Sequence, residues 1–313
     1  MKPKVELGYA DFALKWLEER KPFIKSSSYA AYATLLFNHL LPYWGEWDVA
    51  KIQEHDVQEF ILRLAGPGGD VFSESYLRGI VGLLINILRD AARQRQAPIP
   101  FFRLHYPAQA RGRRPMAVLS PSQREQLTAA VFADFTPCSC GILLALHTGL
   151  RIGELCALKW SSIDLDEGLV HVRQTMQRVY LKEASGRGHT ELLFGQPKSR
   201  SAEREIPLSR WMVETLHRLP AAVGDAFLLS GTPHCVEVRT YRSSFGQFLK
   251  RHQLTHFHFH VLRHTFASRC IECGADPKTV SELLGHSTIA MTMNRYVHPR
   301  IEQKRQCVEA ISR

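Results

Sequence analysis

Several features of membrane, secreted and metal-binding proteins are missing from the 313-residue chain. No apolar run reaches the length needed to cross a bilayer, which argues against a membrane protein. The seven cysteines are an odd number without a regular framework, and no signal peptide precedes them, so we expect a reduced cytoplasmic location. No pair of Cys or His residues repeats at zinc-finger spacing. We therefore expect neither a metal nor another cofactor.

Acidic residues are in the minority. The chain has 40 Lys and Arg against 30 Asp and Glu, a formal net charge of +10 and a pI near 9.4. This surplus favours a polyanionic partner such as double-stranded DNA, although a merely soluble basic protein is consistent with it. Residues 1–110 are nearly balanced, whereas residues 89–114 hold seven arginines and one aspartate. The positive charge is thus concentrated between the two halves of the chain.

Hydrophobic periodicity predicts a small all-α domain in residues 1–107. Its second helix begins at three serines that can cap it, and we expect Pro42 to end it. Such a bundle indicates no function by itself. The expected helices are Tyr9–Glu19, Ser26–Leu41, His55–Leu64 and Ser73–Arg95.

A proline-rich and arginine-rich segment follows, which suits neither helix nor strand. We place an interdomain linker at residues 108–117. Its arginines can contact DNA phosphates without reading sequence, or they can simply keep a solvated loop extended. The candidate DNA-binding residues are Arg103, Arg111, Arg113 and Arg114.

Residues 118–313 predict an α+β domain. A helix begins near Ser120, and the apolar run Gly141–Leu146 predicts a buried helix. The alternating pattern of residues 160–176 predicts a hairpin, and residues 178–195 a long loop or an extended hairpin tip. A short strand is expected at residues 227–229. Further helices are expected at residues 209–219, 241–252, 260–273 and 277–284.

Groups suited to phosphodiester chemistry gather near the C-terminus. His260 and Arg263 are three residues apart and share one helix face. His286 follows Gly285, and Tyr296 lies ten residues beyond it. A guanidinium can hold a phosphate, imidazoles can move protons, and a phenol can attack. Earlier in the chain, Arg151 opens a short helix on which Glu154 can orient it, although an ordinary surface ion pair has the same spacing.

These motifs resemble those of the tyrosine recombinases, the phage integrase family of DNA strand-exchange enzymes. That family carries Thr-Gly-x-Arg-x-x-Glu, then His-x-x-Arg, Leu-Gly-His and a tyrosine about ten positions later. The matching stretches here are Thr148–Glu154, His260–Arg263, Leu284–His286 and Tyr296. Each motif is weak alone, but all four occur in the family's order.

The resemblance implies a mainly α-helical fold with a small β-sheet, in which a four-helix core-binding (SAM-like) domain precedes an α+β catalytic domain. It implies that Tyr296 attacks, that Arg151 and Arg263 clamp the phosphate, that His260 assists the phenol's proton and that His286 hydrogen-bonds the phosphate. The pattern Pro197-Lys198-Ser199 to Ile206-Pro207-Leu208 resembles the family's hairpin with a catalytic lysine, so Lys198 is expected to protonate the leaving oxygen. Lys182 in the same loop is the alternative. Glu154 and His264 are supporting residues.

The resemblance also implies partners. A tetramer acts on two DNA duplexes through a Holliday junction, and a C-terminal tail packs on a neighbouring protomer unless it folds back on its own domain. We expect a mobile-element integrase with a possible accessory directionality factor, in a cytoplasmic, nucleoid-associated location. Chromosome or plasmid dimer resolution and a catalytically silent DNA-binding regulator are the alternatives.

A histidine-rich segment leaves a metal-dependent nuclease as a third possibility. Imidazoles and thiolates are zinc ligands, and such an enzyme would lose activity in chelator. We consider it the minority interpretation because cations fixed in the protein can replace the charge of a metal ion. The candidate ligands are His256, His258, His260, His264, Cys270 and Cys273.

Overall fold

The computed structural model describes residues 7–66, 72–107, 117–182, 188–195, 203–220, 225–296, 305 and 308–309. The chain divides into two compact units, one of Met1–Arg114 with Val179–Glu191 and one of Pro115–Arg178 with Leu192–Arg313. Within the described residues, no helix combines the length and the apolar character needed to cross a membrane. Each unit is described by itself.

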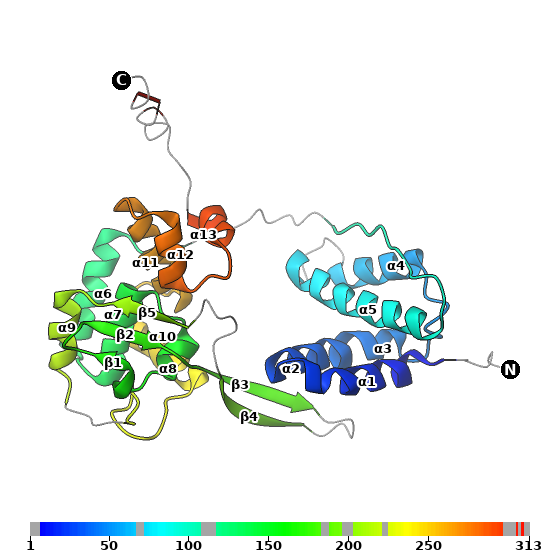
Figure 1. Cartoon of the computed structure of the whole chain (residues 1–313), viewed down its shortest axis with the longest axis horizontal. Helices are drawn as coiled ribbons and strands as arrows, with labels where there is room; N and C mark the ends of the chain where they lie inside the picture. Colours follow the sequence, from blue (N-terminus) through cyan, green and yellow to red (C-terminus); the bar gives the residue numbers. More distant parts are fainter. Residues whose placement is uncertain are drawn as a thin grey trace. The chain divides into compact units, whose positions relative to one another are not determined.

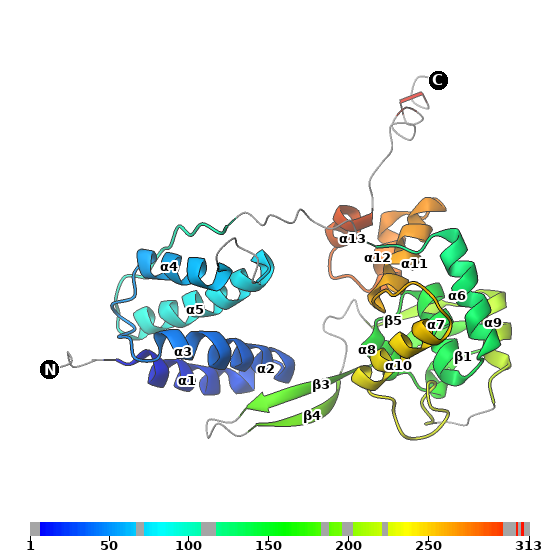
Figure 2. The same cartoon turned by 180° about the vertical axis from the view of Figure 1, so that it is seen from behind.

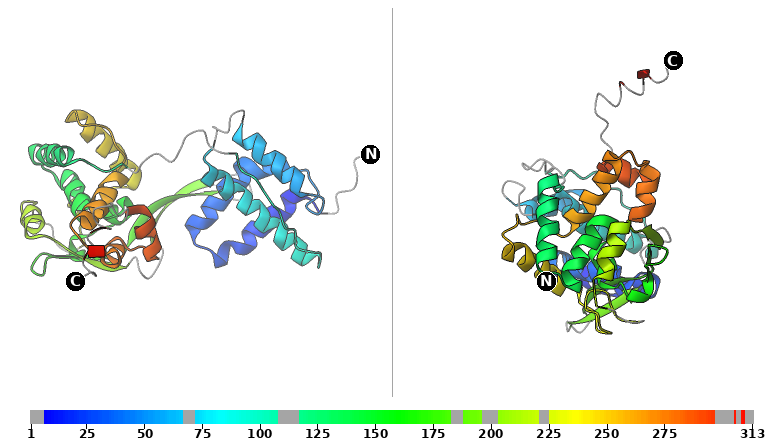
Figure 3. Two further views of the ribbon diagram at one scale, coloured as in Figure 1. Left: turned by 90° about the horizontal axis from the view of Figure 1, so that it is seen from above. Right: turned by 90° about the vertical axis from the view of Figure 1, so that its left-hand side faces the viewer.

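The N-terminal part of the first unit is an all-α bundle, as expected (Figure 1). Buried aromatic residues, among them Trp44 and Phe60, pack against the apolar face of its longest helix, to which Ile80 and Leu84 belong. The left view of Figure 3 shows these helices, coloured blue to cyan, as one group. The elements are α1 (Tyr9–Arg20), η1 (Lys21–Phe23), α2 (Ser26–Leu35), η2 (Leu36–Leu40), α3 (Leu41–Trp44), α4 (Glu54–Ala65) and α5 (Glu74–Gln94).

The expected end of the second helix at Pro42 is wrong. The π-helical segment η2 connects α2 to α3, and Pro42 lies in the first turn of α3. A proline lacks an N–H donor and its ring crowds the preceding turn, and the looser π-helical hydrogen bonding just before it accommodates both effects. The expected serine cap is also wrong, because the residue at the N-cap is Lys25, without a side-chain cap.

The second unit contains the remaining helices and the three-stranded sheet (Figure 1), whereas the two-stranded sheet is divided between the units, because Val179–Glu191 belongs to the first. Its helices are α6 (Pro121–Ala133), α7 (Pro137–Thr148), α8 (Ile152–Cys156), η3 (Trp160–Ser162), α9 (Arg210–His217), α10 (Val238–Arg251), α11 (His260–Glu272), α12 (Pro277–Leu284) and α13 (Ile289–Tyr296). The strands of the chain are β1 (Ile163–Asp164), β2 (Leu169–Val172), β3 (Thr175–Lys182), β4 (Gly188–Gly195) and β5 (Arg204–Pro207).

Helix α7 is the centre of this unit. Its apolar run is buried, as the sequence predicted, and it is packed by α6, α9, α10 and α11. The helix ends at Gly149, whose φ of 68° is left-handed. A Cβ at Gly149 would lie 2.6 Å from Phe266 and 2.9 Å from Leu284, so only glycine fits here. This ending brings the chain directly to Arg151.

The two sheets are small, and their strands are short. Strands β1, β2 and β5 form an antiparallel sheet in which Val170 pairs with Ile206. Strands β3 and β4 form a separate two-stranded sheet, so the described residues 178–182 and 188–195 are the paired strands of an extended hairpin and not a loop. The expected strand at residues 227–229 is wrong, because only an isolated bridge joins Phe227 to Lys159.

Candidate active site

Glu154 is shared by two arginines. Its carboxylate accepts a hydrogen bond from the Arg151 guanidinium at 2.7 Å and from the Arg151 backbone N–H at 2.9 Å. Nη2 of Arg204, on β5, donates to the same carboxylate at 3.0 Å. The Glu154 and Arg204 side chains are 2% and 6% exposed, whereas that of Arg151 is 36% exposed. The carboxylate therefore holds Arg151 from inside and leaves part of the guanidinium open to solvent.

The loop after α12 holds the same guanidinium from the other side. Nη2 of Arg151 donates to the carbonyl of Gly285 at 3.1 Å, and Nε of Arg204 donates to the carbonyl of Leu283 at 2.6 Å. Gly285 has a φ of 62° and ends α12. The end of α12 thus turns the carbonyls of Leu283 and Gly285 toward Arg204 on β5 and Arg151 at the start of α8.

Arg263 is the third arginine of the cluster and is almost completely buried. Its Nη1 donates to the carbonyl of Gly149 at 2.7 Å, and its Nη2 donates to the carbonyl of Leu284 at 2.6 Å. Burial lowers the pKa of Arg263, yet a guanidinium stays charged at neutral pH. Two loop ends that lie far apart in the sequence, after α7 and after α12, are therefore fixed to one charged group on α11.

Three helices meet at the candidate nucleophile. Figures 1 and 2 show α11, α12 and α13 together at one end of the second unit. Tyr296 ends α13 and is 7% exposed. Its ring lies parallel to the imidazole of His286, with 6.4 Å between the centroids. The imidazole is held by Thr292, whose hydroxyl is 2.8 Å from Nδ1 of His286.

The histidine in contact with the phenol is His264. Its Nδ1 lies 2.8 Å from the Tyr296 hydroxyl. The sequence motif had pointed to His260 for this proton, but His260 is exposed and contacts His264 edge to face, with 4.4 Å between the ring centroids. Among the described residues no hydrogen bond joins His260 to Tyr296.

The positive surroundings keep the site histidines neutral. Burial lowers the pKa of His264 and His286, each to about 4, and nearby positive charges act in the same direction. Desolvation by surrounding protein atoms, followed by nearby arginines, also lowers the pKa of His260, although part of its side chain is exposed. Burial raises the pKa of Tyr296 and outweighs the charges of nearby arginines, which lower it. Burial also opposes ionisation of Glu154, but Arg204 and then Arg151 outweigh it and hold the pKa of the carboxyl below its usual value. The free site thus holds cations beside neutral imidazoles and a neutral phenol.

Several residues singled out in the sequence lie outside this cluster. Arg103 is exposed in the first unit, and its backbone N–H donates to Glu54 on α4 at 2.7 Å. Lys198 and the other three linker arginines lie outside the described residues, as do most of the tail residues after Tyr296. Across the described residues, no three His, Cys, Asp or Glu side chains are grouped as metal ligands would be.

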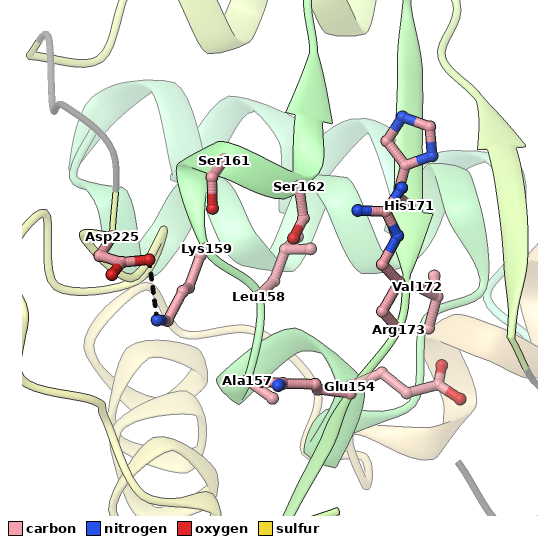
Figure 4. Close-up of a pocket in the computed structure, with 11 residues that line it drawn as sticks. Glu154, Ala157, Leu158, Lys159, Ser161, Ser162, His171, Val172, Arg173 and Asp225 are labelled. Carbon is pink, nitrogen blue, oxygen red and sulfur yellow. Dashed lines mark hydrogen bonds and ion pairs between the residues drawn. The ribbon is translucent and has the colours of Figure 1, made fainter. Parts of the chain in front are cut away.

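A polar pocket of about 220 Å³ lies behind α8 (Figure 4). It is lined by Lys159, His171 and Arg173, and Nζ of Lys159 lies 3.0 Å from Asp225. Glu154 also borders it, but Figure 4 shows its carboxylate directed away from Lys159. Tyr296, Arg151 and Arg263 are not among the residues that line this pocket.

Two residues of the cluster were not recognised as site residues in the sequence. Arg204 is separated from Glu154 by 50 residues, and the only signal for it was its place in the pattern that ends Ile206-Pro207-Leu208. Thr292 contacts His286 through its hydroxyl, and no sequence motif marks it. Both residues position other side chains of the site.

Comparison with known proteins decides the family. The model of the phage integrase family matches residues 117–303, and that of the phage integrase N-terminal SAM-like domain matches residues 9–65. The chain belongs to the phage integrase family. The described fold, helical with small antiparallel sheets, is that of integrases of this family.

The relatives of this integrase family member include tyrosine recombinases and transposases. A tyrosine recombinase XerC-like protein of Caldanaerobacter subterraneus is 29% identical over 186 residues, which cover 54% of this chain and 48% of that protein. The transposase from transposon Tn916 of Enterococcus faecalis is 28% identical over 205 residues, covering 59% and 48%. The chain thus spans about half the length of the curated relatives it matches.

The fold of the integrase also matches a solved structure along nearly its whole length. The Tn1549 transposon integrase in complex with transposon right-end DNA superposes with a TM-score of 0.76 at 21% identity, covering 98% of this chain and 100% of that one. At this identity the likeness establishes the fold alone.

Proposed function

We propose that the chain is a tyrosine-type site-specific DNA recombinase that cleaves and rejoins DNA strands through a covalent 3′-phosphotyrosine. The observation that carries this proposal is the convergence of Arg151, Arg263 and His286 around Tyr296. A protein that only binds DNA has no need of a phenol beside two fixed guanidiniums. The same arrangement therefore disfavours the alternative of a silent regulator.

The proposed reaction begins with attack by the Tyr296 oxygen on the scissile phosphorus. The P–O5′ bond breaks as the O–P bond to tyrosine forms, and the phenol's proton passes to an imidazole. Arg151 and Arg263 neutralise the negative charge on the non-bridging oxygens, and His286 hydrogen-bonds them. Lys198, or alternatively Lys182, protonates the departing 5′ oxygen. Attack by a 5′ hydroxyl of another duplex reverses these steps and rejoins the strands without ATP.

The assembly that would use this chemistry is also a proposal. The family resemblance supports a tetramer on two duplexes, a Holliday junction intermediate and a tail that packs on the neighbouring protomer. We propose residues 1–107 as the helical DNA clamp, 108–117 as the linker whose arginines contact phosphates, and 118–313 as the catalytic domain. The transposon relatives favour integration and excision of a mobile element, with an accessory directionality factor, in the cytoplasm at the nucleoid. Dimer resolution is the second candidate, because recombinases named XerC are also relatives.

The test is a search for the covalent intermediate. Purified protein is incubated in chelator with labelled DNA from the sequence flanking its own gene, and the products are separated on a denaturing protein gel. We expect a slowly migrating labelled band with the natural chain and none with Tyr296→Phe. Tyr296→Phe should still shift DNA in a native gel, because it removes only the hydroxyl. Cleavage without the band, or cleavage only with added metal, would contradict the proposal.

A further inference from the structure

We propose that His264, the residue after the His-x-x-Arg motif, is the group that holds the Tyr296 hydroxyl at rest and accepts its proton when the phenol attacks DNA. The inference rests on the proposed recombinase function and assigns one of its proton transfers. It differs from the role that the motif gives to His260. It follows from the contacts of the phenol oxygen, which are specific to this packing of α11 against α13.

The contacts of the phenol leave one proton acceptor among the described residues. Nδ1 of His264 is 2.8 Å from the hydroxyl. The other charged groups that act on the phenol are Arg263, Arg295 and Arg151, all of which are cations without a lone pair to accept a proton. A phenol that attacks must release its proton as its oxygen bonds to phosphorus. His264 is the group in position to take it.

The other two histidines are arranged for different tasks. The His286 ring lies parallel to the Tyr296 ring with 6.4 Å between the centroids, and its Nδ1 is already engaged by Thr292. Among the described residues, no hydrogen bond joins His286 to the Tyr296 hydroxyl. His260 lies over the edge of His264 and is exposed. His260 is therefore free to contact DNA or solvent, whereas His264 is the histidine that contacts the phenol hydroxyl.

Helix geometry explains why the side chain of His264 points toward Tyr296. Arg263 and His264 are adjacent on α11, so their side chains point about 100° apart around the helix. Arg263 turns inward to the carbonyls of Gly149 and Leu284. His264 consequently turns toward α13, where Tyr296 ends the helix. The buried arginine fixes the rotation of α11 and thereby the direction of the imidazole.

The charges around His264 make its basicity depend on the substrate. Facing it are His260 and Arg263 from α11, Arg295 from α13 and His286 from the loop after α12, and burial together with these groups lowers its pKa to about 4. In the free protein the transfer of a proton from the phenol is therefore strongly unfavourable. A DNA phosphate placed between the arginines and the imidazole adds negative charge, which favours the protonated imidazole. The phenol is thus activated only when the scissile phosphate is in place.

The experiment compares three variants in the covalent-adduct assay. His264→Asn keeps a polar group near Nδ1 but cannot act as a base, His260→Asn tests the competing assignment, and His258→Asn is the matched control from the exposed segment before α11. We expect His264→Asn to slow adduct formation about 100-fold at pH 7. Its rate should then climb steeply as the pH rises, because hydroxide replaces the missing base. His258→Asn should keep the natural rate and pH profile.

Chemical rescue separates proton transfer from a structural effect. Fluorinated tyrosine at position 296 is more acidic and needs less help from a base, so it should restore His264→Asn at pH 7. A uniformly slow His264→Asn that fluorotyrosine does not restore, or a rescue confined to His260→Asn, would overturn the proposal.

The contact itself has a readout that does not depend on activity. The ¹⁹F resonance of 3-fluorotyrosine at position 296 in the free protein should move in His264→Asn and stay in place in His258→Asn. An unchanged resonance in His264→Asn would remove the basis of the inference. Absence of any adduct with the natural chain, despite the ¹⁹F shift, would instead refute the recombinase function and the proton transfer that rests on it.

Discussion

Glu154 and Arg204 form a buried ion pair between α8 and β5, with 3.0 Å between Oε2 of Glu154 and Nη2 of Arg204. The two residues are 50 positions apart, and each also binds a further partner, Arg151 for Glu154 and the Leu283 carbonyl for Arg204. One carboxylate therefore joins the helix that carries Arg151, the strand β5 and the end of α12.

Glu154→Gln should destabilise the protein by about 3–5 kcal/mol, because it removes the negative charge that the buried guanidinium of Arg204 faces at 3.0 Å. Chemical denaturation at pH 7 measures this change. Glu205→Gln is the matched control: Glu205 is the next residue of β5, and its side chain is 64% exposed and lies 3.2 Å from His171. It should change the free energy of unfolding by about 1 kcal/mol or less. If the two variants lost the same free energy of unfolding, the buried ion pair would contribute no more to stability than an exposed one.

Gly149→Ala tests the turn that positions Arg151. Alanine strains the left-handed backbone, and its Cβ would overlap Phe266 and Leu284, so we expect a loss of about 2–4 kcal/mol. Gly246→Ala is the contrasting substitution, because Gly246 lies within α10 and a Cβ there meets nothing within 4 Å. It should be neutral or stabilise by up to about 1 kcal/mol. Thermal melting of both variants checks the prediction, and a stable Gly149→Ala would contradict it.

Local patterns in the sequence predicted most helices because their signals lie within one element. The buried run of α7 and the apolar periodicity of α5 are such signals, and both helices are as expected. Pro42 shows the limit of this reasoning. A proline usually ends a helix, but the five-residue π segment before it changes the hydrogen-bond register, and no residue pattern marks that segment.

The same limit applies to the site: short motifs identify some of its residues, whereas others are recognised only from contacts in the folded chain. Arg151, Arg263, His286 and Tyr296 could be selected from motifs, because each motif is a short stretch of chain. Which group reaches the phenol depends on how α11 is rotated against α13, and spacing along one helix does not determine this. Arg204 and Thr292 were missed for a related reason, since their partners become neighbours only in the folded chain.

Thr292→Val should impair catalysis more than stability. Valine keeps the shape of the fully buried Thr292 side chain but removes the hydroxyl that orients His286. We expect covalent adduct formation to fall about tenfold, which corresponds to about 1.4 kcal/mol of lost transition-state stabilisation. Thr292→Ser retains the hydroxyl and loses a buried methyl group, so it should lose about 1 kcal/mol of stability and keep its activity. Equal activity of the valine and serine variants would contradict the role of the hydroxyl.

The site histidines predict a loss of stability in mild acid. Their pKa of about 4 in the folded chain lies below the value of about 6.5 for an unfolded histidine. As the pH falls from 6.5 toward 4, the unfolded chain takes up protons that the folded chain does not bind. The contribution of these histidines to the free energy of unfolding therefore decreases as the pH falls from 6.5 toward 4. Above about pH 6.5 this contribution is constant.

His264→Asn provides the measurement for this prediction. The variant lacks one of the imidazoles with a lowered pKa, so its stability should fall less between pH 7 and pH 4.5 than that of the natural chain. The difference should be about 1–2 kcal/mol, after allowance for the partial solvent exposure of the imidazole. Urea denaturation at the two pH values gives both slopes, and His258→Asn controls for the removal of a histidine from the neighbouring exposed segment. A His264→Asn slope as steep as that of the natural chain would mean that the imidazole titrates in the folded protein at the same pH as in the unfolded chain, and that burial and the neighbouring cations do not lower its pKa.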